Sequence, residues 1–406
     1  MLLVLVLLAD PWTSFRGGDG IAATTLPKSL AGGQSVWRTE LPGRGWSSPV
    51  VAGDLLWMTT ALDDGRDLRL LAVDRRDGRL VHDIGLLTPS DIKPIHDQNS
   101  HASPTPCVAG GLVVAHFGRY GTAAVDAASG QLAWTNTEHV IQHGGGPGSS
   151  PVAAAGHVIL TMDGADASYV VALDTGSGRE VWRRDRSAPK RDNPITHRAF
   201  ATPLVTEHDG RTLVIAPGAD QLQAYDAATG QERWHVRYVG FSTVPQPARW
   251  DDRVIHTTGF FRPSLRAVTL GGQGDVTRTH LAWEYEGAVP DIPSPLVALD
   301  HVWLVTDKGV LTVIDAAVGS RRKVGRLGGN FTASPVFVPT AADAGTIVLG
   351  NREGELVTVD VTRQGHTITT AISRVDLGEA MFATCVPLDG ALYVRTESAL
   401  HKFADQ

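Results

Sequence analysis

The sequence predicts an all-β fold built from one short unit that recurs along most of the chain. A start made of small residues, Pro and apolar residues returns about every 48 residues, with six intervals over the 286 residues from Pro49 to Pro335. Each unit holds short runs of β-branched and apolar residues between Gly or Asp turns. Apolar runs with helical spacing are missing. A period near 48 residues with four short strands is typical of a β-propeller blade.

Eight units can be followed by their starts. The segments are 47–50 (SSPV), 102–106 (ASPTP), 149–152 (SSPV), 201–204 (ATPL), 245–248 (PQPA), 293–296 (PSPL), 333–336 (ASPV) and, without the proline, 383–386 (ATCV). Four antiparallel strands with tight hairpins would form one blade. A single blade cannot cover both of its faces, whereas blades stacked in a closed ring can. The units therefore predict an eight-bladed β-propeller, with seven blades as the alternative if one unit is irregular.

Both ends of the chain contribute to the predicted ring. The eighth unit stops at Gln406 after its third strand, while residues 33–37 (GQSVW) have the Gly and Trp spacing of a fourth strand. We expect residues 36–41 to complete the last blade, so that 36–406 is a single propeller domain. Residues 10–35 are Gly-rich and predict an irregular arm. Residues 1–9 (MLLVLVLLA) are either the end of a signal peptide or an apolar N-terminus, and the run is too short to span a bilayer.

Composition excludes some functions. The formal net charge is −7, and the longest basic run is RRK at 321–323, so nucleic acid is not an expected partner. No segment predicts a transmembrane helix. Cys107 and Cys385 lie in non-adjacent units, which favours two buried thiols over a disulfide.

The repeats resemble the pyrroloquinoline-quinone (PQQ) type repeat, which is also found in BamB-like outer-membrane assembly proteins. Three segments carry it most clearly: 126–134 (DAASGQLAW), 174–182 (DTGSGREVW) and 226–234 (DAATGQERW). Beyond its first ten residues or so, the chain also resembles a large bacterial group of PQQ-like propeller proteins. The matching phrases are SFRGGDGIA (14–22), LPGRGWSSPVV (41–51), NSHASPTP (99–106), GPGSSPV (146–152), HRAFATPLV (197–205), GDVTRTHLAW (274–283) and GGNFTASPV (328–336).

The resemblance implies a structural role for the Asp, Gly and Trp positions, because Trp on the outer strand of such repeats packs against the neighbouring blade. These positions are Trp37, Asp126, Gly130, Trp134, Asp174, Gly178, Trp182, Asp226, Gly230, Trp234 and Trp283. The dehydrogenases that the chain resembles hold PQQ with calcium and carry a disulfide between adjacent cysteines over the cofactor. No adjacent cysteines occur here. PQQ with calcium is therefore a disfavoured cofactor.

The loops that lead from the outer strand of one blade to the inner strand of the next should surround the central funnel, where propellers usually bind ligands. The first four are long and polar, and we consider their side chains, with those of three later loops, as candidates for ligand binding: Arg44, His96, Asp97, Asn99, His101, His143, His197, Arg198, Asp291, Asn330 and Glu379. If the histidines converge, they could bind a divalent metal. With Asp291 or Glu379 opposite, they could bind a sugar or perform acid–base chemistry. The alternative is that they are solvated or cap loop backbone.

The leading functional hypothesis is an exported, non-catalytic binding or scaffold module, expected as a monomer, whose partner is an unidentified protein or glycan. An extracytoplasmic enzyme or carbohydrate-binding protein with a His-rich funnel is the second hypothesis. A PQQ-dependent dehydrogenase is the third.

Overall fold

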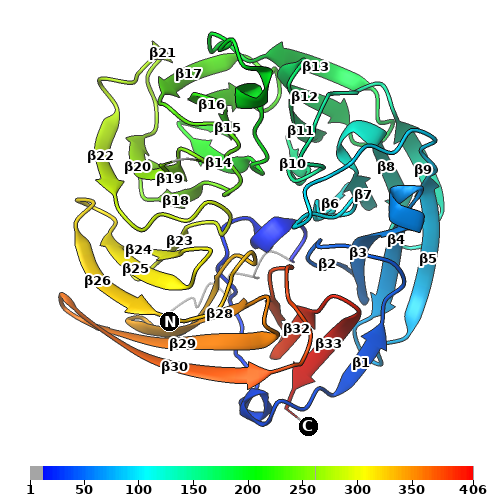
Figure 1. Ribbon diagram of the computed structural model, residues 1–406, viewed down its shortest axis with the longest axis vertical. Coiled ribbons are helices and arrows are strands. Elements are labelled where there is room, and N and C mark those ends of the chain that lie inside the picture. The colour runs from blue at the N-terminus through cyan, green and yellow to red at the C-terminus, as the bar shows by residue number, and fades with distance from the viewer. Residues whose placement is uncertain (1–11, 261, 406) are drawn as a thin grey trace, which may run out of the picture.

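The computed structural model describes residues 12–260 and 262–405. Their strands form eight antiparallel sheets that radiate from a central axis (Figure 1). Helical structure in this part of the chain is restricted to short 3-10 turns, and none of its helices is long and apolar enough to span a membrane. The prediction of an all-β, eight-bladed propeller is confirmed.

Each blade has its first strand, or β31 in the last blade, near the axis and its outer strand at the rim (Figure 1). Blade 1 contains β2 (Val50–Ala52), β3 (Leu55–Leu62), β4 (Asp67–Asp74) and β5 (Leu80–Leu87). Blade 2 contains β6 (Cys107–Ala109), β7 (Leu112–His116), β8 (Thr122–Asp126) and β9 (Leu132–Asn136). Blade 3 contains β10 (Val152–Ala154), β11 (His157–Asp163), β12 (Ser168–Asp174) and β13 (Glu180–Asp185). Blades 4 and 5 contain β14 (Leu204–His208), β15 (Arg211–Gly218), β16 (Gln221–Asp226) and β17 (Glu232–Arg237), then β18 (Ala248–Trp250), β19 (Arg253–Thr257), β20 (Ser264–Thr269) and β22 (Leu281–Glu286).

Blades 6 and 7 follow the same order. They contain β23 (Leu296–Ala298), β24 (His301–Val305), β25 (Val310–Asp315) and β26 (Arg321–Arg326), then β27 (Val336–Ala341), β28 (Ala344–Gly350), β29 (Glu355–Gln364) and β30 (Thr367–Asp376). The insertion in the fifth unit adds a strand to blade 4 instead of blade 5. Its residues form β21 (Gly274–Asp275), which pairs in parallel with β17.

The last blade is built from both ends of the chain. Its inner strands are β31 (Val386–Leu388), β32 (Ala391–Arg395) and β33 (Ala399–Ala404), and its outer strand is β1 (Trp37–Glu40). β1 pairs antiparallel with β33 from Trp37 opposite Lys402 to Glu40 opposite Ala399. Closure of the ring by the N-terminal strand is confirmed.

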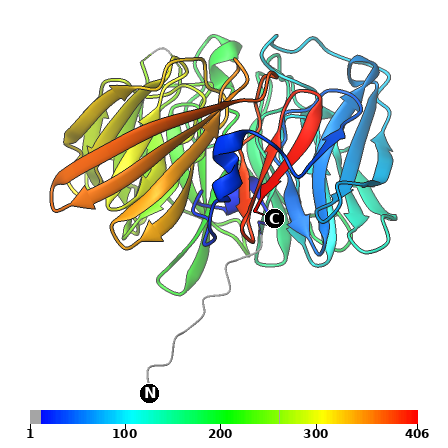
Figure 2. The ribbon, with the colours of Figure 1, turned by 90° about the horizontal axis from the view of Figure 1, so that it is seen from below.

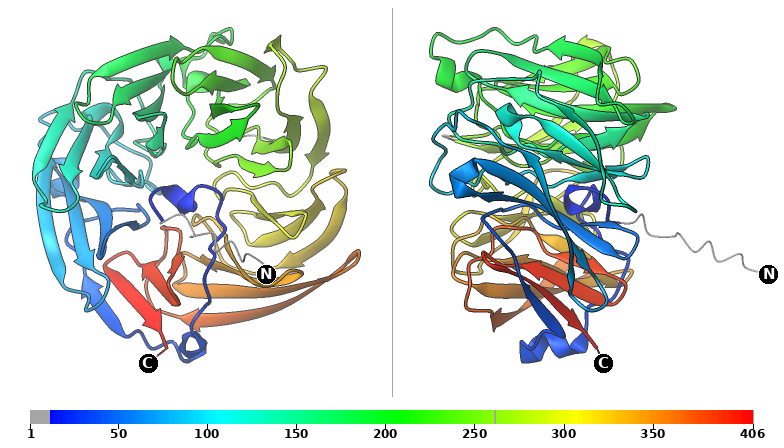
Figure 3. Two further views of the ribbon diagram at one scale, coloured as in Figure 1. Left: turned by 180° about the vertical axis from the view of Figure 1, so that it is seen from behind. Right: turned by 90° about the vertical axis from the view of Figure 1, so that its right-hand side faces the viewer.

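The segment before β1 crosses the rear face of the ring (Figure 3). Its first turn, η1 (Phe15–Gly17), lies near the axis, and its second, η2 (Lys28–Gly32), lies at the rim beside β30 of blade 7 and β33 of blade 8 (Figures 1 and 3). Ala22 N donates to Phe337 O and Phe337 N donates to Gly20 O, which fixes the segment to blade 7. The predicted segment 1–9 lies outside the described residues.

Adjacent blades are joined by tryptophans of their outer strands. The indole Nε1 of Trp134, Trp182 and Trp283 donates to the carbonyl of Thr175, Ala227 and Ala316, respectively, in the next blade. Each ring also covers the Gly of that blade's turn, so closely that a Cβ on Gly178 would lie 2.3 Å from Trp134. Burying an indole in this way contributes a few kcal/mol to stability.

Two blades make the same contact without tryptophan. Lys323 occupies the Trp position of blade 6, and its Nζ lies 3.5 Å from Ile368 O in blade 7. His82 occupies it in blade 1, where the imidazole covers Gly130 and stacks on Trp57. Lysine or histidine at the Trp position of the outer strand can therefore also contact the next blade.

Both cysteines are buried and free. Burial raises the pKa of the Cys107 and Cys385 thiols to about 12, so both remain protonated at neutral pH. Neither thiol has the reactivity of a catalytic nucleophile.

Candidate functional site

The long connecting loops all lie on the face opposite η1, which we call the front face. They comprise residues 88–106, 137–151 and 186–203, and they project toward the top of Figure 2. In Figure 3, right, the same loops extend to the left, away from η1. The polar side chains predicted to bind a ligand are distributed over this face.

Two of these side chains tie neighbouring loops together. Asn99 Nδ2 donates to Gly145 O (2.7 Å) and to Pro147 O (3.0 Å), which joins the first two long loops. His143 Nδ1 lies 2.5 Å from Gly146 O, and its Nε2 lies 3.4 Å from Ala199 O in the third loop. Burial lowers the pKa of His143. Both residues thus organise loop backbone.

His197 acts in the same way within the third loop. Its Nδ1 lies 3.1 Å from Ala165 O and its Nε2 lies 2.7 Å from Arg191 O, so both ring nitrogens face carbonyl oxygens. Arg198 follows it and donates from Nε to Ile195 O (3.2 Å). Burial lowers the pKa of Arg198.

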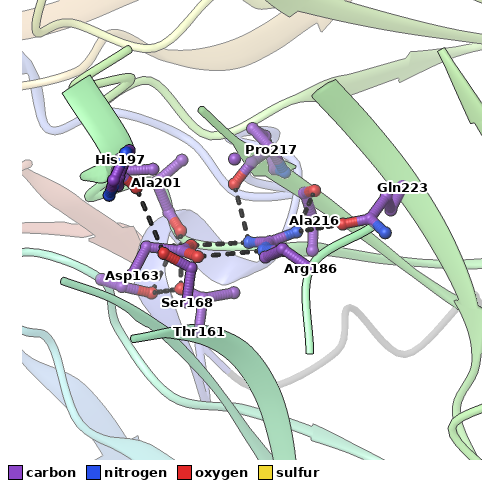
Figure 4. Close-up of polar contacts among 12 residues, drawn as sticks. Thr161, Asp163, Ser168, Arg186, His197, Ala201, Ala216, Pro217 and Gln223 are labelled. Carbon is purple, nitrogen blue, oxygen red and sulfur yellow. Dashed lines mark hydrogen bonds and ion pairs between the residues drawn. The ribbon is translucent and has the colours of Figure 1, made fainter. Parts of the chain in front are cut away.

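Beneath this loop lies a buried ion pair (Figure 4). Arg186 and Asp163 are 4% and 1% exposed, and Arg186 Nη2 lies 2.6 Å from Asp163 Oδ2. The guanidinium also donates to Ala216 O, Pro217 O and Gln223 Oε1 in blade 4. Burial acts to lower the pKa of Arg186, but the Asp163 carboxylate outweighs it and holds the pKa above its ordinary value. The pair fastens blade 3 to blade 4.

His96 N donates to Gly145 O in the second loop, but among the described residues the side chains of His96, Asp97 and His101 form no hydrogen bond or ring contact with His143 or His197. His96 and Asp97 are exposed, and His96 Nδ1 accepts a hydrogen bond from Gln98 N. His101 packs against Tyr120 with ring centroids 5.8 Å apart, and burial lowers its pKa. Within the described residues, no group of three or more His, Cys, Asp or Glu side chains is placed to hold a metal ion. The condition on which the metal hypothesis depended, convergence of the histidines, is not met.

Four side chains form a stack on the front face near the axis. Trp46 and Phe382 lie face to face with centroids 3.9 Å apart. The Arg44 guanidinium lies 4.8 Å from the centre of the Trp46 ring, and that of Arg352 lies 5.6 Å from Phe382. This cation–aromatic stack covers the axis where the loops of blades 8 and 1 meet.

Asn330 and Glu379 are engaged in contacts within the protein. Asn330 Nδ2 donates to Glu353 Oε1 (2.5 Å), and Lys308 donates to its Oδ1 (3.0 Å). Glu379 accepts hydrogen bonds from Arg38, Thr396 and Ser398 in blade 8. Burial acts to raise the pKa of Glu379, but these donors outweigh it and lower the pKa to about 2. Glu379 is thus an ionised anchor for the closing strand.

Asp291 lies in an environment that raises the pKa of its carboxyl group. Its backbone N donates to Asp307 Oδ2 (2.9 Å), and its own Oδ1 is buried without a partner in the structure. Burial, followed by the charge of Asp307, raises the pKa of Asp291 to about 6. Burial also raises the pKa of Asp307. The two carboxyl groups therefore titrate as a coupled pair at the mouth.

Asp291→Asn is expected to change how stability depends on pH. A carboxyl whose pKa is raised in the folded state stabilises that state most below its unfolded value near 4, and the contribution is lost as pH rises to about 6. The melting temperature of the wild type should therefore fall, relative to the variant, between about pH 4 and pH 6.5. Calorimetry over this range measures the difference. Asp97→Asn, at a side chain 99% exposed, is the control and should show no such trend; a trend of equal size in both would contradict the prediction.

A small cavity lies on the axis, between the stacked rings of Trp46 and Phe382 and the ring of Phe15 in η1. Its volume is about 80 Å³. Nine hydroxyl side chains line it, including Ser103 and Thr332. The other seven come one from each blade except blade 5: Ser48, Thr105, Ser150, Thr202, Ser294, Ser334 and Thr384. They precede the Pro, or in blade 8 the Cys, that starts each inner strand. The same starts predicted the blades from the sequence, and the Ser or Thr that recurs before the Pro or Cys is the sequence signal of this hydroxyl ring.

PQQ does not fit this centre. A tricyclic quinone requires a site of several hundred Å³, whereas the axial cavity measures about 80 Å³. Trp46 and Phe382 stack on each other, which leaves no gap between them for a planar cofactor. The side chains lining the cavity include no carboxylate to hold calcium or to act as a base. We therefore derive no reaction step through this group.

Fold and site together define a propeller of PQQ-type repeats with a hydroxyl-lined axial cavity and a front face of mutually bonded loops. A family model described as outer membrane protein assembly factor BamB matches residues 28–145, 93–208 and 166–398. These overlapping matches cover most of the sequence, so the chain belongs to this family. The family resemblance predicted from the sequence is confirmed.

Solved structures share the fold at low sequence identity. BamB from Moraxella catarrhalis is 17% identical with a TM-score of 0.59, over 91% of this chain and 99% of that chain. Quinohemoprotein alcohol dehydrogenase from Comamonas testosteroni is 13% identical with a TM-score of 0.64, over 97% of this chain and 80% of that chain. The computationally designed protein Ika8 is 12% identical with a TM-score of 0.56, over 90% and 98%. No curated protein matches the sequence.

Proposed function

We propose that the chain is a non-catalytic binding module whose front face docks a protein partner. The observation that carries the proposal is an exposed apolar patch on loops of blades 4 and 5. The front-face patch comprises Ile195, Val239, Phe241 and Phe260, of which Val239 is 81% exposed, Phe260 48% and Ile195 46%. Exposed apolar side chains gathered in one place are typical of protein interaction sites.

Hydrogen bonds hold the loops of the front-face patch side by side. Ser242 N donates to Arg198 O (2.7 Å), which places the loop of Phe241 against the loop of Ile195. Phe260 N donates to Phe241 O (2.9 Å), and the two rings pack edge to face with centroids 6.2 Å apart. Loops fixed in this way lose little conformational entropy when a partner binds.

The charges beside the patch favour an acidic partner. Arg198 has no ion-pair partner within 4 Å in the described part of the chain, and Lys190 donates only to a backbone carbonyl. Arg262 is exposed next to the patch on the Phe260 loop. Asp192 is the opposing charge in the same loops. A partner surface with apolar side chains flanked by carboxylates would complement this arrangement.

Except for Asp291 and His101, the partly buried polar candidates of the front face are engaged in hydrogen bonds within the protein, which favours binding over catalysis. The side chains of Asn99, His143 and His197 form hydrogen bonds with loop carbonyls. The Arg198 Nε also donates to a loop carbonyl. Glu379 is ionised and held by three donors. Groups committed to such bonds organise a surface and are poorly free to move protons during a reaction.

We extend the proposal to a location outside the cytoplasm. The description of the matching family names outer-membrane assembly, and the sequence begins with the apolar run 1–9 that a signal peptide would contain. Fractionation of cells that produce the native protein would test this location directly.

The front face can be tested with a photo-cross-linking residue. Placed at Val239, p-benzoylphenylalanine is expected to give a discrete cross-linked product in the native host, because a docked partner would lie within reach. The same residue at Val324, which is 51% exposed on outer strand β26, is the matched control and should give none.

A second change connects the product to the patch. Adding Phe260→Asp to the Val239 reporter should abolish the product, because it places a charge where the partner buries apolar surface. Equal products at Val239 and Val324, or a product that survives Phe260→Asp, would overturn the proposal.

A further inference from the structure

The seven axial hydroxyls form a hydrogen-bonded belt around the cavity. Except at Thr202, whose neighbour in blade 5 is Gln246, the backbone N–H of each position donates to the hydroxyl of the next blade: Ser48 to Thr105, Thr105 to Ser150, Ser150 to Thr202, Gln246 to Ser294, Ser294 to Ser334, Ser334 to Thr384, and Thr384 back to Ser48. The distances lie between 2.9 and 3.1 Å. Blade 5 has Gln246 at this position, and its Nε2 donates to Pro203 O (3.3 Å).

This direction of donation leaves the hydroxyl protons free. Each oxygen accepts from a backbone N–H, so its own O–H can turn toward the axis. Only Ser334 uses that proton within the described structure, donating to Ser294 Oγ (3.1 Å). Six O–H donors and the unpartnered Oγ1 of Thr332 remain around the same cavity. Each belt side chain is at least nine-tenths buried.

Two buried arginines without carboxylate partners bond to residues beside the cavity lining, although neither guanidinium lines the cavity itself. Arg16 is fully buried on the rear side, where its Nη2 donates to Pro295 O and Pro335 O while Nε and Nη1 have no partner in the structure. Pro295 and Pro335 directly follow the belt residues of blades 6 and 7. Asp19 is exposed and affects Arg16 only from a distance.

The second arginine lies on the front side. Arg395 is 2% exposed, and its Nη1 donates to Ser47 O, Ser47 Oγ and Thr59 O, while Nε has no partner. Ser47 lies between Trp46 and Ser48, both of which line the cavity. Burial lowers the pKa of Arg16 to about 10 and that of Arg395 to about 9, so both remain charged at neutral pH.

We propose that the axial cavity binds a small inorganic anion of the size of chloride or bromide. A ring of O–H donors, with two buried guanidinium groups bonded to residues beside its lining, is chemically matched to negative charge, and no carboxylate lines the cavity to favour a cation. An anion would also offset the charge of two cations removed from water, which water in the same space would not do. A volume of about 80 Å³ admits an ion of this size and excludes an organic cofactor.

Two measurements on the full chain test the site. Crystals grown in sodium bromide should show an anomalous scattering peak inside the hydroxyl belt. In solution, the melting temperature should rise by about 3 °C between chloride-free and saturating chloride. Ionic strength is held constant in that titration with sodium gluconate, whose anion is too large for the cavity. No bromide peak together with no chloride dependence would mean that the cavity holds water only and would overturn the proposal.

Two variants test whether the chloride dependence of the melting temperature arises from the hydroxyl belt. Thr202→Val removes one O–H donor and should weaken the chloride dependence, whereas Thr312→Val removes a buried, unpartnered hydroxyl that does not line the cavity and should leave it unchanged. If Thr202→Val does not fold, the bromide peak in the wild-type protein still decides the matter. Equal loss of chloride dependence in both variants would contradict the assignment to the belt. The site is independent of the partner proposed for the front face.

Discussion

Asp163→Ala is expected to lower the free energy of unfolding by about 3–5 kcal/mol, because it leaves Arg186 charged and buried without its carboxylate. The carbonyls of Ala216 and Pro217 would still accept hydrogen bonds from the guanidinium, but they carry no full negative charge. Chemical denaturation of purified protein measures the loss. Asp185→Ala, which removes an exposed partner of Arg183 at 3.3 Å, is the control and should cost less than about 1 kcal/mol.

A double variant separates the charge from the packing. Asp163→Leu combined with Arg186→Met removes both charges and should recover part of the stability lost in Asp163→Ala. Recovery should remain incomplete, because Arg186 also satisfies carbonyls of blade 4. If Asp163→Ala costs no more than Asp185→Ala, the pair does not fasten blades 3 and 4.

Gly230→Ala is expected to destabilise the protein by about 2–4 kcal/mol, whereas Gly210→Ala should cost about 1 kcal/mol. Both glycines have nearly the same backbone, with φ of +68° at Gly230 and +69° at Gly210. A Cβ on Gly210 would meet nothing within 4 Å, but on Gly230 it would lie 2.5 Å from the Trp182 ring. The difference between the two variants therefore measures how tightly the indole covers the turn.

The same comparison in a Trp182→Ala background identifies the source of the difference. Without the indole, Gly230→Ala should cost about as much as Gly210→Ala, since only the backbone penalty remains. Thermal or denaturant unfolding of the four variants provides the data. An unchanged difference in the absence of Trp182 would show that the Gly230 turn is strained for another reason.

Much of the fold could be predicted because each blade repeats its own local signals. The starts at Ser48, Ser150 and Ser294 marked the inner strands, and the Gly and Trp spacing of residues 33–37 identified the closing strand. The strand pairing of the fifth unit could not be predicted in the same way. Its insertion, residues 270–280, pairs with β17 of the preceding blade and not with a strand of its own blade. Local pattern does not specify a pairing between blades.

The candidate site was less predictable for the same reason. His96, His101, His143 and His197 lie in loops of similar polarity, but the bonds of each depend on which carbonyls the next loop brings near. No sequence pattern marks Phe382 or Arg352 as a candidate site residue. In the structure, Phe382 stacks on Trp46, and Arg352 lies over the Phe382 ring. Whether any predicted residue of the front face contacts a ligand stays a prediction.

The sequence by itself predicted eight blades with seven as the alternative, the closure of the ring and the positions where outer strands meet the next blade, because these depend on short-range strand and turn preferences repeated along the chain. Only the tertiary structure decided which polar groups are free. The belt hydroxyls and Arg16 are far apart in the sequence, and their convergence on the axis, like the exposure of Val239 and Phe260, results from packing between blades. Burial and hydrogen-bond partners are properties of that packing, and they are what make a side chain available to a ligand.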